Sequence, residues 1–536
     1  MKRLLIYFIT ISILGSCNKV LNKKPTDFVD VTNYYSSEAE LNLALTGVYD
    51  VLGNEYLYGS SLWYQMGICT DEGFYNYSSN AYSAPMFYQY DYTNPYVTGI
   101  WQQCYIGIER ANLLIANINK PSMDETRRNV ILGEALFLRA YYYFLLVTNY
   151  GDVPLKITPN TDVNTVNIPR TPMKEVYEQI LTDMKEAETK VNTITVAGNT
   201  SRITKTAVQG ILARVCLKMA GYPLNDTEKY KDALLWADKV IAGNEHALVT
   251  TYDATLTNSA YSQIFINESR DVYETKECIW EADFYMNDNS TAYFEASKLG
   301  TMNLGCNNLD TGYAGSNIKT SIRLYNLYGA GDARRDWNIC PFYFNSTATT
   351  ATRVNYTASN IIGREMGKWR RYYEKLAPPK QQYYNGTNFP ILRYADVLLM
   401  QAEAENEVNG ATAKAYNAIN QVRRRGYKVP IDATNATADL TSGLSQIQFR
   451  QAIMDERARE LCYEGLRKAD LIRWGTFTTV LSAMTTEINN SNASATNKSR
   501  WTLGFITAAA STKYLLLPIP SLEININKAM EQNPGW

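Results

Sequence analysis

ITKTAVQGILARVCLKMAGYPLNDTEKYKDALLWADKVIA, residues 203–242, indicates the fold class of this 536-residue chain. Two apolar stretches, 203–221 and 228–242, repeat with helical spacing and are separated by a short polar turn. Ala207, Gly210 and Ala213 are small and share one stretch, so the first helix can approach its neighbour closely. The segment therefore predicts a tightly packed helical hairpin.

The hairpin is similar to a degenerate tetratricopeptide repeat, a unit of 34 residues. Ser37 and Glu40 form a capping-box pattern at the start of another helix. The same periodicity predicts a mainly α fold whose helical scaffold spans about 37–244 and 390–426, with further helices in 447–485. A plain helical bundle is the alternative. The expected helices cover residues 37–52, 101–118, 125–150, 172–191, 203–221, 228–242, 390–409 and 412–426.

Three other regions, 56–100, 245–390 and 485–536, are rich in Asn, Ser, Thr, Gly and Tyr and lack long apolar stripes. We expect loops, short strands and short helices there, including a strand at Cys278–Glu281. These regions are too long to be simple connections, so we expect them to form an irregular lobe of a single domain over 33–536 and regard them as candidates for function.

Charge and composition exclude several functions. Lys and Arg total 52 against 53 Asp and Glu, which argues against a nucleic-acid binder. The single histidine, His246, excludes His-rich metal centres. No phosphate-binding, dinucleotide-binding or nucleophile-elbow motif occurs, so we predict no cofactor. Cys216 and Cys462 lie in helical patterns and are expected to be buried.

The first residues are typical of an export signal. Lys2 and Arg3 precede an apolar run, 4–14, that is too short to span a membrane. The run ends at Leu14-Gly15-Ser16-Cys17, which resembles a bacterial lipobox. We therefore expect a signal peptide at 1–16, lipidation of Cys17 and a lipidated tether at 17–32. An ordinary signal peptide cut near a chance cysteine is the alternative.

One pair of carboxylates could serve catalysis. Glu456 and Glu460 are four residues apart and share a helix face, as the two acids of a retaining glycosidase could. Arginines are interleaved with them throughout 454–475. That pattern favours a salt-bridged helix over an acid of raised pKa, so we do not expect this pair to be catalytic.

Four ordered stretches together resemble the SusD/RagB-like outer-membrane nutrient-binding lipoproteins. The stretches are LGEALFLRAYYYF with YGDVP in 132–154, RYADVLLMQAEAEN at 393–406, ERARELCYEGLRKADLIRW at 456–474, and LLPIP at 516–520 with QNPGW at 532–536. With the lipobox, the resemblance covers nearly the whole chain. Asp396 stands where the family usually has Glu, and Lys468-Ala469 replace a common aromatic and hydrophobe.

The resemblance implies about four tetratricopeptide-like units with an irregular lobe packed on them. It further implies a cell-surface binding protein, not an enzyme, that captures oligosaccharides, or peptides in some members, for a SusC-like TonB-dependent transporter. The implied location is the outer membrane, lipid-anchored and facing the exterior, although 18–24 lacks the acidic run that often accompanies surface export. Alternatives are a surface glycosidase and a structural repeat protein with no small ligand.

Aromatic side chains mark the predicted ligand site. Residues 56–105 hold eleven Tyr, two Phe and two Trp, and a second aromatic stretch follows at 284–294. Sugar rings have apolar faces that stack on aromatic rings and hydroxyl edges that carboxylates and amides can bind. Trp101 and Trp280 lie in apolar patterns and are expected in the core. The predicted ligand-binding residues are Asp71, Tyr75, Tyr77, Tyr82, Tyr88, Tyr90, Tyr285, Asn287 and Tyr293.

Overall fold

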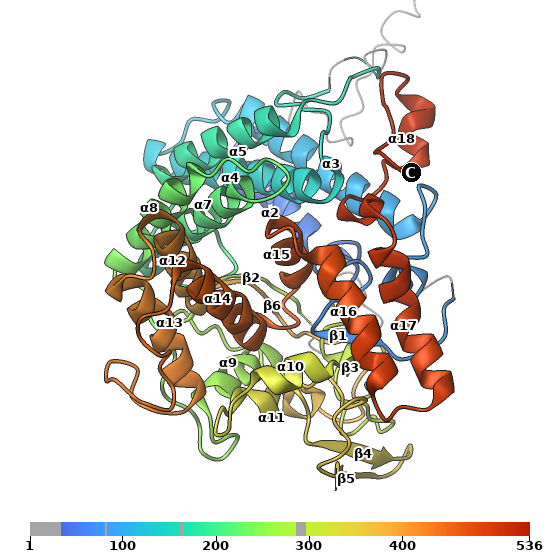
Figure 1. The fold of residues 1–536 in the computed structure, drawn as a ribbon. Coiled ribbons are helices and arrows are strands. Elements are labelled where there is room, and N and C mark those ends of the chain that lie inside the picture. Colours follow the sequence, from blue (N-terminus) through green and yellow to red (C-terminus); the bar gives the residue numbers. More distant parts are fainter. Residues whose placement is uncertain (1–33, 81–82, 161, 163–165, 286–295) are drawn as a thin grey trace, which may run out of the picture.

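A row of antiparallel helices forms one side of the molecule (Figure 1). The computed structural model describes residues 34–80, 83–160, 162, 166–285 and 296–536. Each helix of the row packs on the next, which confirms the predicted helical scaffold. The row runs through α2 (Glu38–Tyr49), α3 (Pro95–Asn117), α4 (Glu125–Tyr150), α5 (Met173–Glu188), α7 (Lys205–Ala220), α8 (Lys229–Ala242), α12 (Tyr394–Asn409) and α13 (Ala413–Gly426).

Local signals in the sequence set the ends of these helices. Ser37 and Glu40 form both hydrogen bonds of the predicted capping box at the start of α2. Asp124 and Thr204 cap α4 and α7 through side-chain oxygens that accept backbone N–H groups. Gly151 ends α4 with a φ of 76°, a backbone conformation that favours glycine.

The row extends into a second group of helices, α14 (Gln446–Leu461), α15 (Arg467–Arg473), α16 (Phe477–Asn490), α17 (Ala495–Ala509) and α18 (Ser521–Ile526). The expectation that 485–536 is irregular is therefore wrong for its first half. Trp501 and Phe505 of α17 are buried, and the Trp501 ring packs against Phe74 of β1. Apolar residues at this spacing favour a helix with one buried face.

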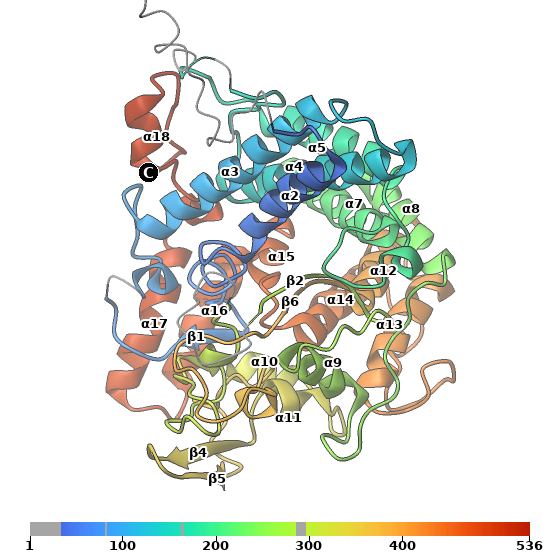
Figure 2. The same ribbon diagram turned by 180° about the vertical axis from the view of Figure 1, so that it is seen from behind.

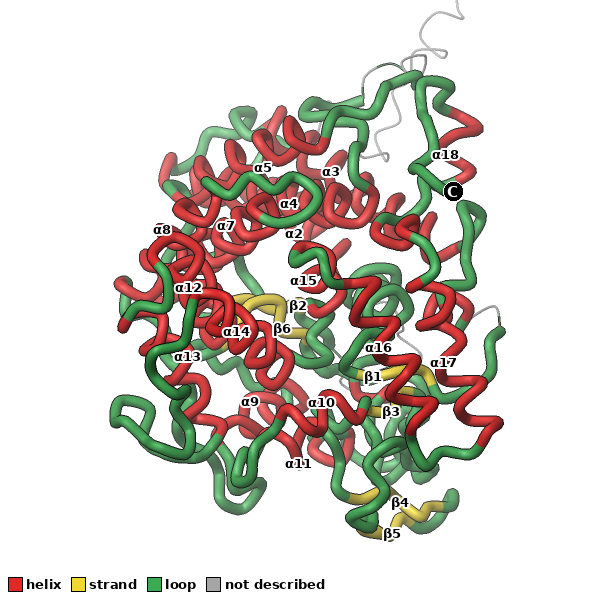
Figure 3. The backbone as a smooth tube through the Cα atoms, in the orientation of Figure 1, coloured by secondary structure: helices red, strands yellow, loops and turns green. Residues whose placement is uncertain are grey.

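The irregular lobe contains short strands in three antiparallel pairs among the described residues (Figure 3). β1 (Gly73–Tyr75) pairs with β3 (Ile318–Thr320), β2 (Cys278–Ala282) with β6 (Phe389–Arg393), and β4 (Phe342–Ser346) with β5 (Ala351–Asn355). Short helices α6 (Ile194–Ala197), α9 (Ala260–Ser269), α10 (Ile322–Leu327) and α11 (Arg334–Asn338) and the 3₁₀ helices η1 (Asp50–Gly53), η2 (Ala84–Phe87), η4 (Gly300–Met302), η5 (Arg371–Tyr373) and η6 (Thr512–Leu515) complete the order.

The predicted strand at 278–281 is confirmed, but the helix expected from 390 begins only at Tyr394. Residues 389–393 instead form β6, all five of them buried beside β2. Pro390 favours extended backbone in its neighbour, and the apolar run that follows suits a buried strand. The β2–β6 pair lies between the helical row and α9–α11 (Figure 2).

One core continues from the helical row into the irregular lobe. Trp101 and Trp280 are buried in it, as predicted, and so are Cys216 and Cys462. Among the described residues, α4 is long and apolar enough to cross a membrane, yet 89% of its most apolar window is buried inside the molecule. Helix α4 is therefore the central core helix of this fold.

Candidate ligand-binding surface

Asp71 lies in the interior, which corrects its assignment to the ligand site. Its side chain is 2% exposed, and its carboxylate pairs with Arg467 at 2.7 Å and with Arg323 at 3.2 Å. Burial alone would raise the pKa of Asp71, but the Arg467 guanidinium outweighs it and holds that pKa below its usual range. Asp71 therefore fixes the start of β1 to α15 and presents no free carboxylate to a solute.

Tyr75, Tyr88 and Tyr90 are also buried, so their assignment to the ligand surface is wrong in this structure. The Tyr88 hydroxyl donates to the Cys69 carbonyl at 2.7 Å. The Tyr90 ring stacks on Trp536 with centroids 5.3 Å apart, and Tyr75 packs edge-on against Phe87. These rings join residues 69–90 to the body of the protein and fix the position of the surface beside them.

Tyr82, Asn287 and Tyr293 lie outside the described residues. Tyr285 is 56% exposed and lines a groove of about 410 Å³ beside α2 and η1. Asp50, Arg202 and Asp283 supply charged groups to the same groove. Tyr285 is therefore accessible to a solute, and its role in ligand binding stays a prediction.

Tyr77 is the other exposed member of the predicted set, at 45%. Its hydroxyl donates to the Gly315 carbonyl at 3.0 Å, which places the loop after β1 against the loop before β3. Tyr313 lies in that second loop, and its ring meets Tyr383 with centroids 6.2 Å apart at 70°. We use the name tyrosine arc for Tyr77, Tyr313, Tyr383 and Tyr384, which follows Tyr383 in the chain.

The rings of the tyrosine arc differ in exposure. Tyr383 is 57% exposed, whereas Tyr313 and Tyr384 are half-buried. The Lys298 ammonium lies 5.4 Å from the centre of the Tyr384 ring and pairs with Glu55. Partial burial and the nearby Tyr313 phenol raise the pKa of Tyr77, so its hydroxyl keeps its proton at neutral pH. The arc thus presents neutral, flat, hydroxyl-bearing rings to solvent.

Buried Arg371 positions two of the loops that carry these rings. Its guanidinium donates to the carbonyls of Tyr313 at 2.9 Å and Gln381 at 2.8 Å, and pairs with Glu374. Gly312, at a φ of 108°, passes so close to Arg371 that an added Cβ would lie 2.6 Å from the arginine Cβ. A rigid buried side chain therefore holds Tyr313 beside Tyr383.

Tyr313, Tyr383 and Tyr384 are not among the residues predicted from the sequence. They lie in DTGYAGS, 310–316, and QQYYNG, 381–386, where aromatic residues neighbour glycine and other turn-forming residues. An aromatic residue within a glycine-containing turn is the sequence signal for such a site. The density of aromatic residues instead favours 56–105, where most of the described rings pack the loops onto the core.

Glu456 and Glu460 do not form an open catalytic pair. Both are fully buried on α14, and each carboxylate meets arginines: Glu456 pairs with Arg334 at 2.7 Å and Glu460 with Arg425 at 2.6 Å. Burial alone would raise the pKa of either group, but the surrounding arginines lower both. A general acid needs the opposite shift and access to substrate, so this pair cannot perform glycoside hydrolysis.

Comparison with known proteins gives the class of this fold. A model described as the SusD family matches residues 276–536, and one described as starch-binding, associating with outer membrane, matches 19–217. A solved SusD homologue from Bacteroides thetaiotaomicron superposes with a TM-score of 0.84 at 27% identity, over 94% of this chain and 98% of that one.

Curated relatives agree with this class. A SusD-like protein, P25, of Formosa agariphila is 25% identical over 88% of this chain and 90% of its own. The starch-binding protein SusD of Bacteroides thetaiotaomicron is 31% identical over 32% of this chain and 26% of its own. The chain belongs to the SusD/RagB family, whose members include glycan-binding proteins.

Proposed function

We propose that this protein is a cell-surface lipoprotein that captures oligosaccharides on the tyrosine arc and delivers them to a SusC-like TonB-dependent transporter. The observation that carries the proposal is the arc itself, with two well-exposed and two half-buried tyrosines. Arg371 fixes the loops of Tyr313 and Tyr383, and the Tyr77 hydroxyl bonds to the first of these loops. The starch-binding description of the matching family model and of one relative supports a glycan as the solute.

The chemistry of the arc suits a neutral sugar. Aromatic faces bind the apolar C–H faces of a pyranose, and tyrosine hydroxyls reach its polar edges. Three charged groups near the arc are paired: Lys298 with Glu55, Lys319 with Glu365 and Arg371 with Glu374. Lys380, which donates to the Arg371 carbonyl, and exposed Asp310 carry opposite charges. Because no single sign of charge dominates beside the rings, an uncharged oligosaccharide is favoured over a charged peptide.

Delivery requires two states of the protein on its transporter. A solute drives closure over the transporter only if it binds the closed state more tightly than the open state. In this proposal the lipid on Cys17, outside the described residues, keeps the protein at the outer membrane while it moves. Cys17→Ala is expected to shift the protein from the membrane fraction to the soluble fraction, and unchanged partitioning would contradict the anchor.

A binding experiment tests the site. The soluble form without residues 1–17 is screened on a glycan and peptide array, and the best ligand is titrated calorimetrically. Tyr383→Ala and Tyr77→Ala should each weaken binding about two- to tenfold, because a stacked ring contributes about 0.5–1.5 kcal/mol. Tyr252→Ala removes a comparably exposed ring, 46%, outside the arc and serves as the control.

Equal affinity of wild type and both arc variants would exclude the arc as the site. Selective capture of peptides would replace the glycan with a peptide while keeping the same surface. Cleavage of a captured glycan by the purified protein would contradict a purely binding function.

A further inference from the structure

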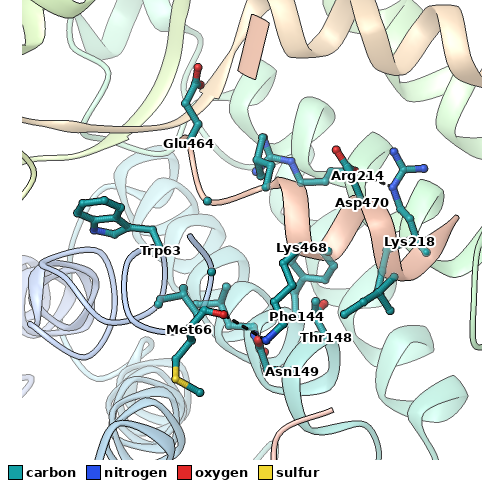
Figure 4. Close-up of a pocket in the computed structure, with 18 of the residues that line it drawn as sticks. Trp63, Met66, Phe144, Thr148, Asn149, Arg214, Lys218, Glu464, Lys468 and Asp470 are labelled. Carbon is teal, nitrogen blue, oxygen red and sulfur yellow. Dashed lines mark hydrogen bonds and ion pairs between the residues drawn. The ribbon is translucent and has the colours of Figure 1, made fainter. Parts of the chain in front are cut away.

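An interior cavity lies between α4, α7, α15 and the segment that follows η6 (Figure 4). Its volume is about 130 Å³, and much of its wall is apolar, including Phe144, Leu217 and Ile472. For comparison, an engineered apolar cavity of about 150 Å³ binds benzene. The cavity is therefore large enough for a ligand of about six non-hydrogen atoms.

A second cavity, of about 170 Å³, adjoins the first. The two share Thr148, Lys218, Ile472 and Leu515 in their walls. The wall of the second also includes exposed residues at the turn after α7 and near the end of the chain, such as Tyr222 and Pro534. The second cavity therefore provides an entrance at the surface. The residues shared by both cavities form a middle section, and the first cavity is an inner chamber.

Most charged groups that line the inner chamber already have partners. Arg214 pairs with Asp396, Arg457 with Asp470, Arg473 with Glu403, and Glu464 with Arg393. The Lys468 ammonium, labelled in Figure 4, donates to the Met66 carbonyl at 3.1 Å. Each of these charged groups therefore has a partner, although the Arg214 Nε makes no hydrogen bond among the described residues.

Lys218 is the exception. Its side chain is buried, with 6% of the residue exposed, and it makes no hydrogen bond or ion pair with any part of the chain that the structure describes. It lines both cavities, where they meet. Burial lowers the pKa of Lys218 to about 8, so the ammonium is still mostly protonated at neutral pH. An unpaired buried cation is costly, and an anion placed beside it would offset that cost.

We propose that the two cavities together bind a short-chain carboxylate, with its carboxylate on the Lys218 ammonium and its hydrocarbon chain in the chamber formed by Phe144, Leu217 and Ile472. The one ammonium where the cavities meet suits a singly charged carboxylate better than a multiply charged phosphate, and the volume excludes an oligosaccharide. This site is separate from the tyrosine arc and does not depend on the proposed capture of glycans.

The test uses hexanoate as the probe and 1-hexanol as its uncharged counterpart, each titrated calorimetrically into the soluble protein at pH 7. Hexanoate should bind the wild type, and Lys218→Met, which preserves side-chain length, should weaken it at least tenfold while leaving hexanol unchanged. Lys239→Met, on the exposed face of α8 against Trp236, is the control and should bind hexanoate like the wild type.

A second variant keeps the test decisive if Lys218→Met fails to fold. Leu515→Trp should fill the shared section and abolish binding of both probes. No hexanoate binding to the wild type, or equal hexanoate affinity in the wild type and both cavity variants, would overturn the proposal. A crystal structure with hexanoate bound elsewhere would do the same.

Discussion

Glu460 shows how a fully buried carboxylate is stabilised in this protein. One of its oxygens accepts from Arg393 at 3.0 Å and Arg425 at 2.6 Å, and the other from Arg334 at 3.0 Å. Removing one member of such a cluster leaves buried charges unpaired, which costs about 3–5 kcal/mol. Glu460→Gln should therefore lower the free energy of unfolding in urea by that amount.

A matched surface change controls for the loss of a charge alone. Glu228 and Lys231 form an exposed pair, and such pairs contribute little in water. Glu228→Gln should shift the unfolding free energy by less than about 0.5 kcal/mol. If the two variants lose equal stability, the buried cluster is not the source of the effect.

Glu281 has the opposite environment, because no basic group pairs with it among the residues that the structure describes. Its carboxyl accepts from Thr200 at 2.8 Å, and burial raises its pKa to about 7. The folded state therefore binds a proton that the unfolded state has lost between about pH 4.5 and 7, so this group's contribution to stability falls as pH rises through that window.

Glu281→Gln mimics the protonated acid at every pH. It should stabilise the protein at pH 8 by up to about 3 kcal/mol and have little effect at pH 4.5. Thermal unfolding of both proteins across this range measures the difference. A gain that is the same at pH 4.5 and pH 8 would show that titration of Glu281 is not the cause.

At the scale of one element, α3 depends on a glycine for its approach to α4. A Cβ added to Gly107 would lie 2.4 Å from the Tyr142 ring, which is fully buried and whose hydroxyl donates to the Val48 carbonyl. Because that ring cannot move freely, Gly107→Ala should destabilise the protein by about 1–3 kcal/mol despite the better helix propensity of alanine.

Gly47 in α2 provides the control, since an added Cβ there has nothing within 4 Å. Gly47→Ala should raise the unfolding free energy by about 0.5–1 kcal/mol. Urea unfolding, monitored by circular dichroism, measures the unfolding free energy of both variants. A stabilising Gly107→Ala would mean that the α3–α4 contact can expand without cost.

Local patterns predicted the helices because capping residues and apolar periodicity lie within one segment, as at Ser37 and Glu40. They failed at β6, whose partner β2 is more than a hundred residues earlier. The assignment of Asp71 and Tyr90 to the ligand site was wrong for the same reason. Asp71 meets Arg467 across 396 residues and Tyr90 meets Trp536, so neither burial can be read from nearby sequence. Tyrosine suits both a core and a ligand surface, and only distant contacts decide between them.

At the scale of the molecule, buried arginines join the irregular lobe to the helices. Arg334 of α11 pairs with Glu456 and Glu460 of α14, and the backbone N–H of Ala333 donates to the carbonyl of Gly426 at the end of α13. The Arg334 guanidinium lies so close to Gly426 that an added Cβ would be 2.4 Å from its Nε. Ion pairs of Arg334 and the backbone hydrogen bond of Ala333 thus join the irregular lobe to α13 and α14 at neighbouring residues.

This junction, with one apolar core continuing through both parts, predicts that the whole described chain unfolds as a unit. Arg334→Met leaves buried Asp332 without its arginine and removes one of the three arginines that pair with Glu456, so it should lower the unfolding free energy by about 3–5 kcal/mol. Arg335→Met changes the neighbouring residue, whose pair with Asp336 is largely exposed, and should cost less than about 1 kcal/mol.

The two parts can be followed separately during urea unfolding of these variants. Circular dichroism reports mainly on the helical row, and Trp337 and Trp369 report on the lobe through fluorescence, with other tryptophans replaced by phenylalanine. Because the core is shared, both signals should still change together in Arg334→Met, at a lower urea concentration than in Arg335→Met. Separated transitions would show that the lobe has a stable core of its own and that the arginine cluster, not apolar packing, couples the two parts.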